Sequence, residues 1–156
     1  MVLDFHRYWS QLAAGSTPER CLFDPTAIPQ VMPTLLVVEL EPETARLRFR
    51  LSGTRADEFA GEVMAGRYLD SFFAGQSEKA ARFFDAIYRR VAATGAPEAG
   101  EYLWPARTGL QQRILFGVFP FSVDGVIRQF FCVEDYTEIY DEKRTRPWSV
   151  GPIASS

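Results

Sequence analysis

Hydrophobic residues near the start of the chain recur with the period of a helix. This pattern predicts an amphipathic helix over residues 4–14, with Asp4 as its N-cap and Gly15 as its end. The recurring apolar positions are Phe5, Tyr8, Trp9 and Leu12. Four prolines follow within residues 15–33, so this stretch is expected to be a turn-rich connector.

The next two segments have the patterns of β-strands. Residues 34–40 are almost continuously apolar, which is typical of a strand buried on both faces. Residues 45–52 alternate, with three apolar side chains on one face and three arginines on the other. The apolar set is Leu47, Phe49 and Leu51, and the basic set is Arg46, Arg48 and Arg50.

The middle of the chain changes to helical patterns, and the last part returns to strands. Short helical pieces are expected over residues 53–75, followed by a long helix over 77–94. Three further strands are predicted, with Asp124-Gly125 favouring the turn between the last two. Their ranges are 98–104, 111–119 and 126–134. This order predicts an α+β fold with a five-stranded antiparallel sheet.

The two final strands have large apolar side chains on both faces. A monomeric sheet does not leave such a patch in water, so another element is expected to cover the outer face. The helix over 4–14 has a matching stripe, and we expect it to pack there, on its own subunit or on a second one in a homodimer. The interface residues predicted are Phe5, Tyr8, Trp9, Leu12, Leu115, Phe119 and Phe130.

Several short motifs resemble a bacterial PAS-like family that occurs largely as small stand-alone proteins in alphaproteobacteria. They span roughly residues 5–135, with Ala13-Ala14 and Phe119-Pro120-Phe121 as departures from the family pattern. The motifs are Trp9-x-x-Leu12-x-x-Gly15-x-x-Pro18-x-Arg20, Asp24-Pro25-x-x-Ile28-Pro29, Pro33, Phe49-Arg50-Leu51-x-Gly53-Thr54, Gly61, Gly66-Arg67-x-Leu69-Asp70 and Asp124-Gly125. The resemblance implies a PAS fold, in which the mid-chain helices form a bracket over the sheet. It also implies sensing and protein contact, without common catalytic residues.

A PAS-like arrangement implies a cavity between the inner sheet face and the bracket. Arg55 favours an anionic ligand such as a carboxylate, and a close-packed core without a ligand is the alternative. The predicted ligand-binding residues are Phe49, Leu51, Thr54, Arg55, Phe59, Tyr68, Phe72, Phe116 and Phe131. Further apolar lining candidates are Val38, Phe84, Ile114 and Val133.

Composition and charge narrow the function classes. The chain of 156 residues fits one domain, and 47% hydrophobic residues are typical of a globular protein. A net charge of −3 gives no general attraction to nucleic acid. No signal peptide and no apolar run long enough for a membrane span are visible, so a cytoplasmic location is expected. The two cysteines, Cys21 and Cys132, are interpreted as free buried thiols.

The residues available for catalysis or metal binding are few. The single histidine, His6, lies off the apolar stripe of its helix and is interpreted as solvated. One histidine and two distant cysteines do not form a familiar zinc site, and no metal or cofactor is predicted. The adjacent pairs Asp57-Glu58 and Glu134-Asp135 are interpreted as solvated carboxylates.

The sequence therefore predicts a non-catalytic, PAS-like regulatory domain. It is expected to bind a small ligand or a protein partner and to signal through a separate effector protein, with no nucleic acid or membrane involved. Two alternatives remain: a ligand-free interaction scaffold, and a small α+β enzyme whose pocket brings His6 and a carboxylate together. The predicted division is residues 1–33 as helix and connector, 34–140 as the core, and 141–156 as a flexible tail.

Overall fold

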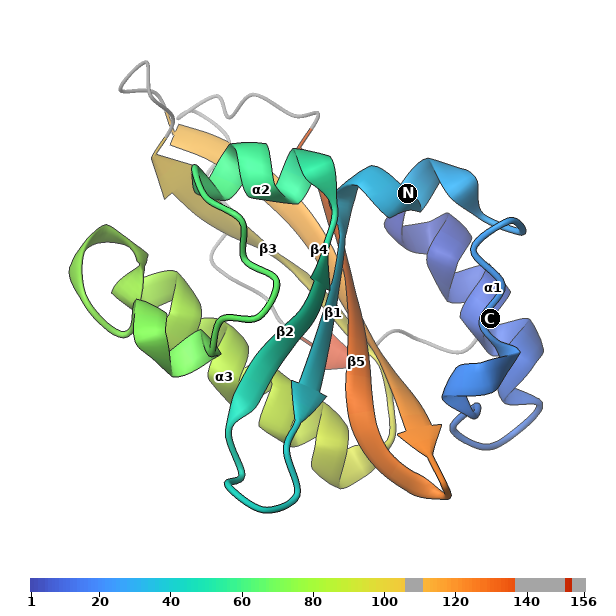
Figure 1. Ribbon diagram of the computed structural model, residues 1–156. Coiled ribbons are helices and arrows are strands. Elements are labelled where there is room, and N and C mark those ends of the chain that lie inside the picture. Colours follow the sequence, from blue (N-terminus) through green and yellow to red (C-terminus); the bar gives the residue numbers. More distant parts are fainter. Residues whose placement is uncertain (106–110, 137–150, 153–156) are drawn as a thin grey trace.

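The computed structural model describes residues 1–105, 111–136 and 151–152 (Figure 1). The α-helices are α1 (Val2–Ala13), α2 (Thr54–Ala60) and α3 (Glu78–Thr94). The strands are β1 (Leu35–Leu40), β2 (Leu47–Ser52), β3 (Glu98–Pro105), β4 (Gln111–Val123), β5 (Val126–Asp135) and β6 (Gly151–Pro152). Short 3₁₀ helices cover Arg20–Leu22, Pro29–Thr34, Leu69–Phe72 and Gly75–Ser77.

The strands form one antiparallel sheet in the order β2-β1-β5-β4-β3-β6. The predicted α+β class and the five principal strands are thereby confirmed. The two-residue strand β6 pairs with Glu98 and Ala99 at the β3 edge and was not expected from the sequence. Apart from Gly151 and Pro152, the predicted flexible tail over 141–156 lies outside the described residues.

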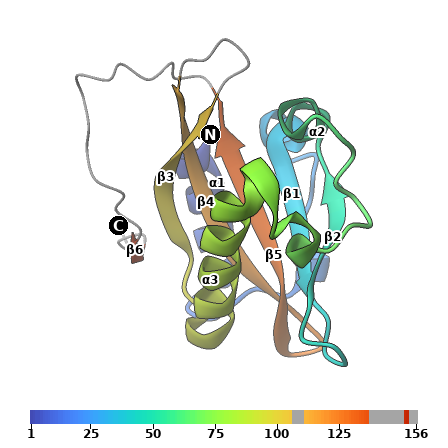
Figure 2. The same cartoon turned by 90° about the vertical axis from the view of Figure 1, so that its left-hand side faces the viewer.

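Helices cover both faces of the sheet. Figure 2 shows α1 on one side and the bracket, with α2 and α3, on the other. The apolar residues divide into two clusters accordingly, because successive side chains of a strand point to opposite faces. Val38, Phe130 and Cys132 lie in the bracket-side cluster, whereas Val37 and Phe131 lie in the α1-side cluster.

The N-terminal helix packs on the sheet of its own chain. Phe5 is fully buried with its ring centroid 4.7 Å from that of Phe119, and the Trp9 indole N–H donates to the Pro120 carbonyl at 2.8 Å. Tyr8 and Leu12 are partly buried against the same cluster.

Two residues of the predicted interface do not belong to it. Phe130 points to the bracket, because it pairs with Val38 rather than with Val37. Leu115 is half-buried on β4 outside the cluster that α1 covers.

A β-bulge in β2 changes the face of one predicted pocket residue. Phe49 pairs with Val38 and Leu51 pairs with Val37, so Arg50 is an extra residue between them. The insertion reverses the alternation after Phe49. Leu51 consequently opposes a residue of the α1 side and is 37% exposed, which corrects its expected position in the bracket-side cavity.

Most element ends differ from the predicted ones by a few residues. Helix α1 begins at Val2 with Met1 as its N-cap, so Asp4 lies in the first turn and does not cap the helix. Strand β2 starts at Leu47 because Ala45 has a positive φ in the preceding turn. Strand β4 continues through Pro120 to Val123, four residues beyond the predicted end.

Two further expectations on individual side chains are wrong. His6 is buried against Phe119 rather than solvated, since the buried face of α1 is wider than its apolar stripe. Cys21 is exposed, whereas Cys132 is buried as expected. None of the described helices combines the length and apolar character that crossing a membrane requires.

Candidate functional site

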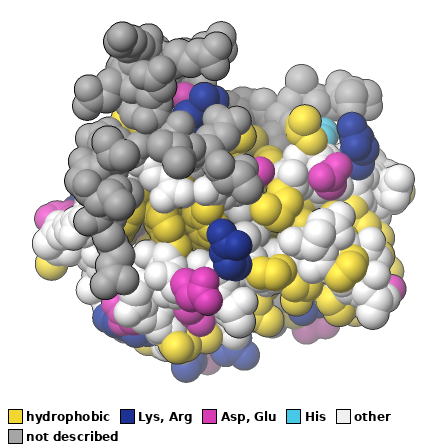
Figure 3. Space-filling model, turned by 90° about the horizontal axis from the view of Figure 1, so that it is seen from above, with side chains coloured by type: hydrophobic (Ala, Val, Ile, Leu, Met, Phe, Trp, Pro, Cys, Tyr) yellow, Lys and Arg dark blue, Asp and Glu magenta, His cyan; other side chains and the backbone are white. Residues whose placement is uncertain are grey.

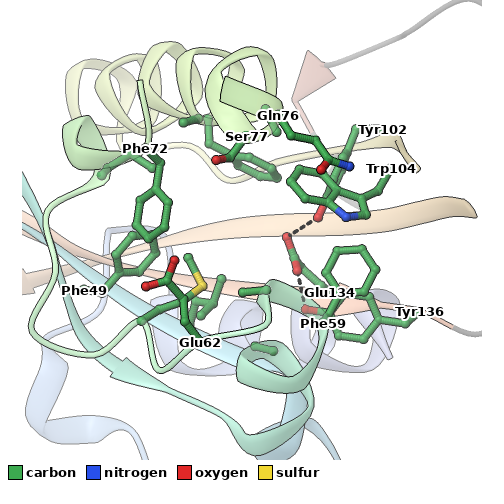
Figure 4. A pocket seen from close by; sticks show the side chains of 18 of the residues that line it. Phe49, Phe59, Glu62, Phe72, Gln76, Ser77, Tyr102, Trp104, Glu134 and Tyr136 are labelled. Carbon is green, nitrogen blue, oxygen red and sulfur yellow. Dashed lines mark hydrogen bonds between the residues drawn. The ribbon is translucent and has the colours of Figure 1, made fainter. Parts of the chain in front are cut away.

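A pocket of about 230 Å³ lies between the sheet and the bracket. Its walls come from β1, β2, β3 and β5 on the sheet side and from α2, α3 and the intervening 3₁₀ turns on the bracket side (Figure 4). Eight lining residues are aromatic: Phe49, Phe59, Phe72, Phe84, Tyr88, Tyr102, Trp104 and Tyr136. The pocket is therefore mainly apolar, as small-molecule sites generally are.

One carboxyl group lies inside this apolar pocket. Glu134, on β5, is only 5% exposed. Its side chain shares a strand face with Phe130 and Cys132, which directs it toward the bracket. The Tyr102 hydroxyl donates to Glu134 Oε1 at 3.0 Å, and the Tyr136 hydroxyl donates to Oε2 (Figure 4).

The surroundings of Glu134 oppose its ionisation. Burial raises the pKa of this carboxyl above its ordinary value, and the two tyrosine hydroxyls, which stabilise the carboxylate, offset part of the increase. Burial and the neighbouring Glu134 also raise the pKa of both Tyr102 and Tyr136. The tyrosines therefore remain hydrogen-bond donors at neutral pH.

The polar network continues along β5 to the long bracket helix. Tyr88 on α3 and Cys132 on β5 are both buried close enough to Glu134 to interact with its charge, and burial raises the pKa of each well above its ordinary value. Cys132 is consequently a neutral thiol and not a nucleophilic thiolate.

Aromatic rings enclose the carboxyl end of the pocket. The rings of Phe59 and Tyr136 are stacked with centroids 4.6 Å apart, and Trp104 lies 5.6 Å from Phe59. Phe49 and Phe72 form an edge-to-face pair at the opposite end, 6.1 Å apart. Figure 4 shows Glu134 beside Phe59, Trp104 and Tyr136, with its two tyrosine partners.

The sequence pattern of PAS domains matches residues 2–121, which is more than half of the chain. The chain belongs to the PAS domain family. The match begins in α1 and ends within β4, so Glu134 and Tyr136 of this PAS domain lie beyond the matched range. No curated protein matches the chain.

Solved structures with similar folds include other PAS proteins. VqmA bound to DPO is 17% identical with a TM-score of 0.54, and the match covers 70% of this chain and 55% of that one. A Vibrio cholerae VqmA dimer is 16% identical with a TM-score of 0.54, and the match covers 76% of this chain and 52% of that one. The PAS domain of Bordetella pertussis BvgS is 11% identical with a TM-score of 0.53, and the match covers 90% of this chain and 89% of that one. These identities show the fold alone, and the chain spans about half the length of the VqmA chains.

The PAS fold brings only part of the predicted ligand set to the pocket. Phe49, Phe59 and Phe72 line it. Phe116 is fully buried behind the wall, with its ring 4.9 Å from that of Phe84. Phe131 faces α1 and not the bracket, so its expected position in the pocket is wrong, as is that of Leu51.

The predicted polar ligand contacts lie outside the pocket. Thr54 and Arg55 are exposed in the first turn of α2, and neither lines the cavity. Tyr68 lies beside β2, where its hydroxyl donates to Glu41 and its ring lies 3.7 Å from the Arg46 guanidinium.

Sequence reasoning missed the polar centre of the site. Glu134 was interpreted as solvated, and Tyr102, Trp104 and Tyr136 were not singled out. The available signal was the alternation of β5, which places Glu134 on the same face as Phe130 and Cys132. Within the described residues, no group of three or more His, Cys, Asp and Glu side chains is arranged to hold a metal ion.

Proposed function

We propose that this PAS domain is a non-catalytic sensory module that binds a small ligand in the pocket between sheet and bracket. The observation that carries the proposal is the buried carboxyl of Glu134 within an apolar cavity of about 230 Å³. A few convergent polar groups among apolar walls are what a small-molecule site requires. VqmA bound to DPO has a similar fold and supports the sensory assignment by analogy.

Two rival functions receive less support. A ligand-free scaffold is expected to have a filled core, and the pocket argues against it. An enzyme was expected to bring His6 and a carboxylate together. His6 packs against Phe119 in the α1 layer, whereas Glu134 lies on the bracket side, so the sheet separates them.

The ligand signal is proposed to reach a separate effector protein, and homodimerisation remains part of the proposal. The outer-face patch that suggested a dimer is covered by α1 of the same chain, so a dimer needs another surface. On the face seen in Figure 3, acidic and basic side chains are interspersed with hydrophobic ones. This mixture, together with the net charge of −3, supports a protein or small-molecule partner over a nucleic acid.

Native mass spectrometry of the purified protein tests ligand binding directly, because it reports a co-purifying molecule and the oligomeric state together. Ala81→Leu, which adds bulk to the α3 wall of the pocket, should remove the bound molecule. Ala86→Leu, on the exposed face of the same helix, is the matched control and should retain it. An equal amount of bound molecule in the two variants would contradict the pocket assignment.

A further inference from the structure

The charged side chains that line the pocket are acidic. Glu134 lies in its interior, and Glu62 lies at its exposed mouth, where it is ion-paired with Arg67. None of the described lining residues is Lys, Arg or His, so Glu134 is the acidic side chain that no described cation neutralises. An anionic ligand, which Arg55 suggested, meets no basic side chain among the described residues that line this cavity. The charge distribution instead favours a ligand that carries positive charge.

Glu134 differs from the other buried acid of the sheet in having no basic partner among the described residues. Glu98 is similarly buried, and both of its carboxylate oxygens accept hydrogen bonds from Arg90, at 3.0 and 2.8 Å. Among the described residues, the groups that donate hydrogen bonds to Glu134 are two tyrosine hydroxyls. A carboxylate has about four acceptor positions, so the described residues leave about two of them unused. Buried carboxylates are normally paired with a cation, and here a ligand can supply it.

The aromatic walls suit the same kind of ligand. Phe59, Trp104 and Tyr136 surround the carboxyl end, and the faces of aromatic rings attract organic cations. The volume of about 230 Å³ exceeds the roughly 150 Å³ of an engineered cavity that binds benzene. The pocket therefore has room for one ring and a short charged substituent.

We infer that the pocket takes a small organic ammonium, an amine with an apolar body, whose nitrogen donates to Glu134 while the body contacts the aromatic walls. This inference rests on the proposed ligand-binding function and specifies its ligand class. A neutral alcohol of the same shape makes the apolar contacts but provides no charge for Glu134. A carboxylate of the same shape meets no basic side chain among the described lining residues.

The experiment measures affinities of the full chain by isothermal titration calorimetry. The probes are 2-phenylethylamine, 2-phenylethanol and phenylacetate, which share a ring and differ in charge. The amine should bind at least about tenfold more tightly than the alcohol, because a charge-assisted hydrogen bond replaces a neutral one. Phenylacetate should not bind.

Variants assign this preference to the pocket. Glu134→Gln keeps the shape of the side chain and should weaken amine binding about tenfold while leaving alcohol binding unchanged. Glu58→Gln makes the same change of net charge on the exposed face of α2 and should have no effect. Trp104→Leu retains the carboxyl and should weaken the amine more than the alcohol, which keeps the test valid if Glu134→Gln fails to fold.

The possible failures can be told apart. Three results overturn the ammonium assignment: equal affinities for amine and alcohol, tighter binding of phenylacetate, or an unchanged amine affinity in folded Glu134→Gln. If Glu134→Gln does not fold, an unchanged amine affinity in Trp104→Leu overturns it. If no probe binds while native mass spectrometry shows a different molecule that Ala81→Leu removes, the ammonium assignment is wrong and the sensory function stands. If no probe binds and no co-purifying molecule is found, both fail.

Discussion

Glu134 illustrates how one residue can define a site that composition and motifs do not reveal. A glutamate at the end of a strand is usually solvated, and its neighbour Asp135 strengthens that impression. The strand face decides the matter: Glu134 points the same way as Phe130 and Cys132, into the pocket. The sequence alone did not identify this face, because Phe130 and Phe131 make both faces of β5 equally apolar.

The raised pKa of Glu134 predicts a pH-dependent stability. Above the ordinary glutamate pKa of about 4.3, the unfolded chain releases a proton that the folded chain retains. The free energy of unfolding should therefore fall as the pH rises through this window, by up to about 1.4 kcal/mol per pH unit, and level off above the folded pKa. Urea unfolding at several pH values measures the slope.

Glu134→Gln should reduce the pH dependence of the free energy of unfolding in this window, whereas Glu58→Gln should leave that dependence unchanged. The titratable groups facing Glu134 are Tyr102 from β3, Tyr136 directly after β5, Cys132 on the same strand and Tyr88 from α3. Burial raises the pKa of each of these four, so they do not titrate between about pH 4 and pH 8. Identical slopes for the wild type and Glu134→Gln would contradict the prediction.

Gly53 is required because the neighbouring backbone leaves no room for a side chain. Its φ of −73° is accessible to any residue. A Cβ there would lie 2.3 Å from the Pro33 carbonyl oxygen and 2.4 Å from that of Met32. Both atoms belong to the backbone, so neither can rotate away as a side chain can.

We expect Gly53→Ala to lower the free energy of unfolding by about 3 kcal/mol, as overpacked sites do. Gly61→Ala, at the other end of α2, is the comparison. Gly61 has a positive φ but no atom near the added methyl group, so only the backbone penalty of about 1 kcal/mol applies. Chemical denaturation of both variants checks the order, and an equal or smaller loss for Gly53→Ala would refute the contact argument.

At the scale of elements, the hydrophobic pattern of the sequence predicted where the helices and strands lie. It was less successful at predicting the sheet face to which each strand residue points. Periodicity identifies α1, α3 and the five long strands because each buries a regular face. The bulge at Arg50 is different, since one inserted residue reverses the alternation without any change in residue type. The alternation along the sequence therefore predicts that Leu51 faces the pocket, whereas the bulge turns it to the other face, where it is partly exposed.

Helix α1 is an integral layer of the fold, and its removal has a predictable result. Deleting residues 1–14 exposes Phe119, Phe121 and Phe131, which are fully buried in the intact chain. Such a patch on an open sheet favours self-association. The truncated chain should aggregate or bind a hydrophobic dye, as measured by light scattering and dye fluorescence. A truncated chain of unchanged mass and stability would refute the assigned role.

A milder change tests the polar contact within the same layer. Trp9→Phe removes the indole N–H that donates to the Pro120 carbonyl and retains most of the buried ring. The buried carbonyl loses that donor, so the free energy of unfolding should fall by about 1–3 kcal/mol. Thermal unfolding measures the loss. An unchanged midpoint would mean that α1 docks through its apolar contacts alone.

At the scale of the whole molecule, the element order and family motifs predicted the PAS fold, and the bracket-side cavity followed from it. Phe49, Phe59 and Phe72 were placed correctly because bracket and strand residues of that kind converge in this fold. Tyr102, Trp104, Glu134 and Tyr136 were not found, since they meet only through the pairing of distant strands. The alphaproteobacterial and stand-alone character of the family remains a prediction.

The arrangement of one sheet between two helical layers places Trp9 and Trp104 on opposite sides of that sheet. Trp9 lies on the face of α1 that packs on the sheet, and Trp104 lies in the wall of the pocket. The third tryptophan, Trp148, lies outside the described residues. In a Trp148→Phe background, the intrinsic emission of Trp104 reports events under the bracket and that of Trp9 reports events under α1. Detachment of the helix and occupation of the cavity thus become separate optical signals from a single unlabelled chain.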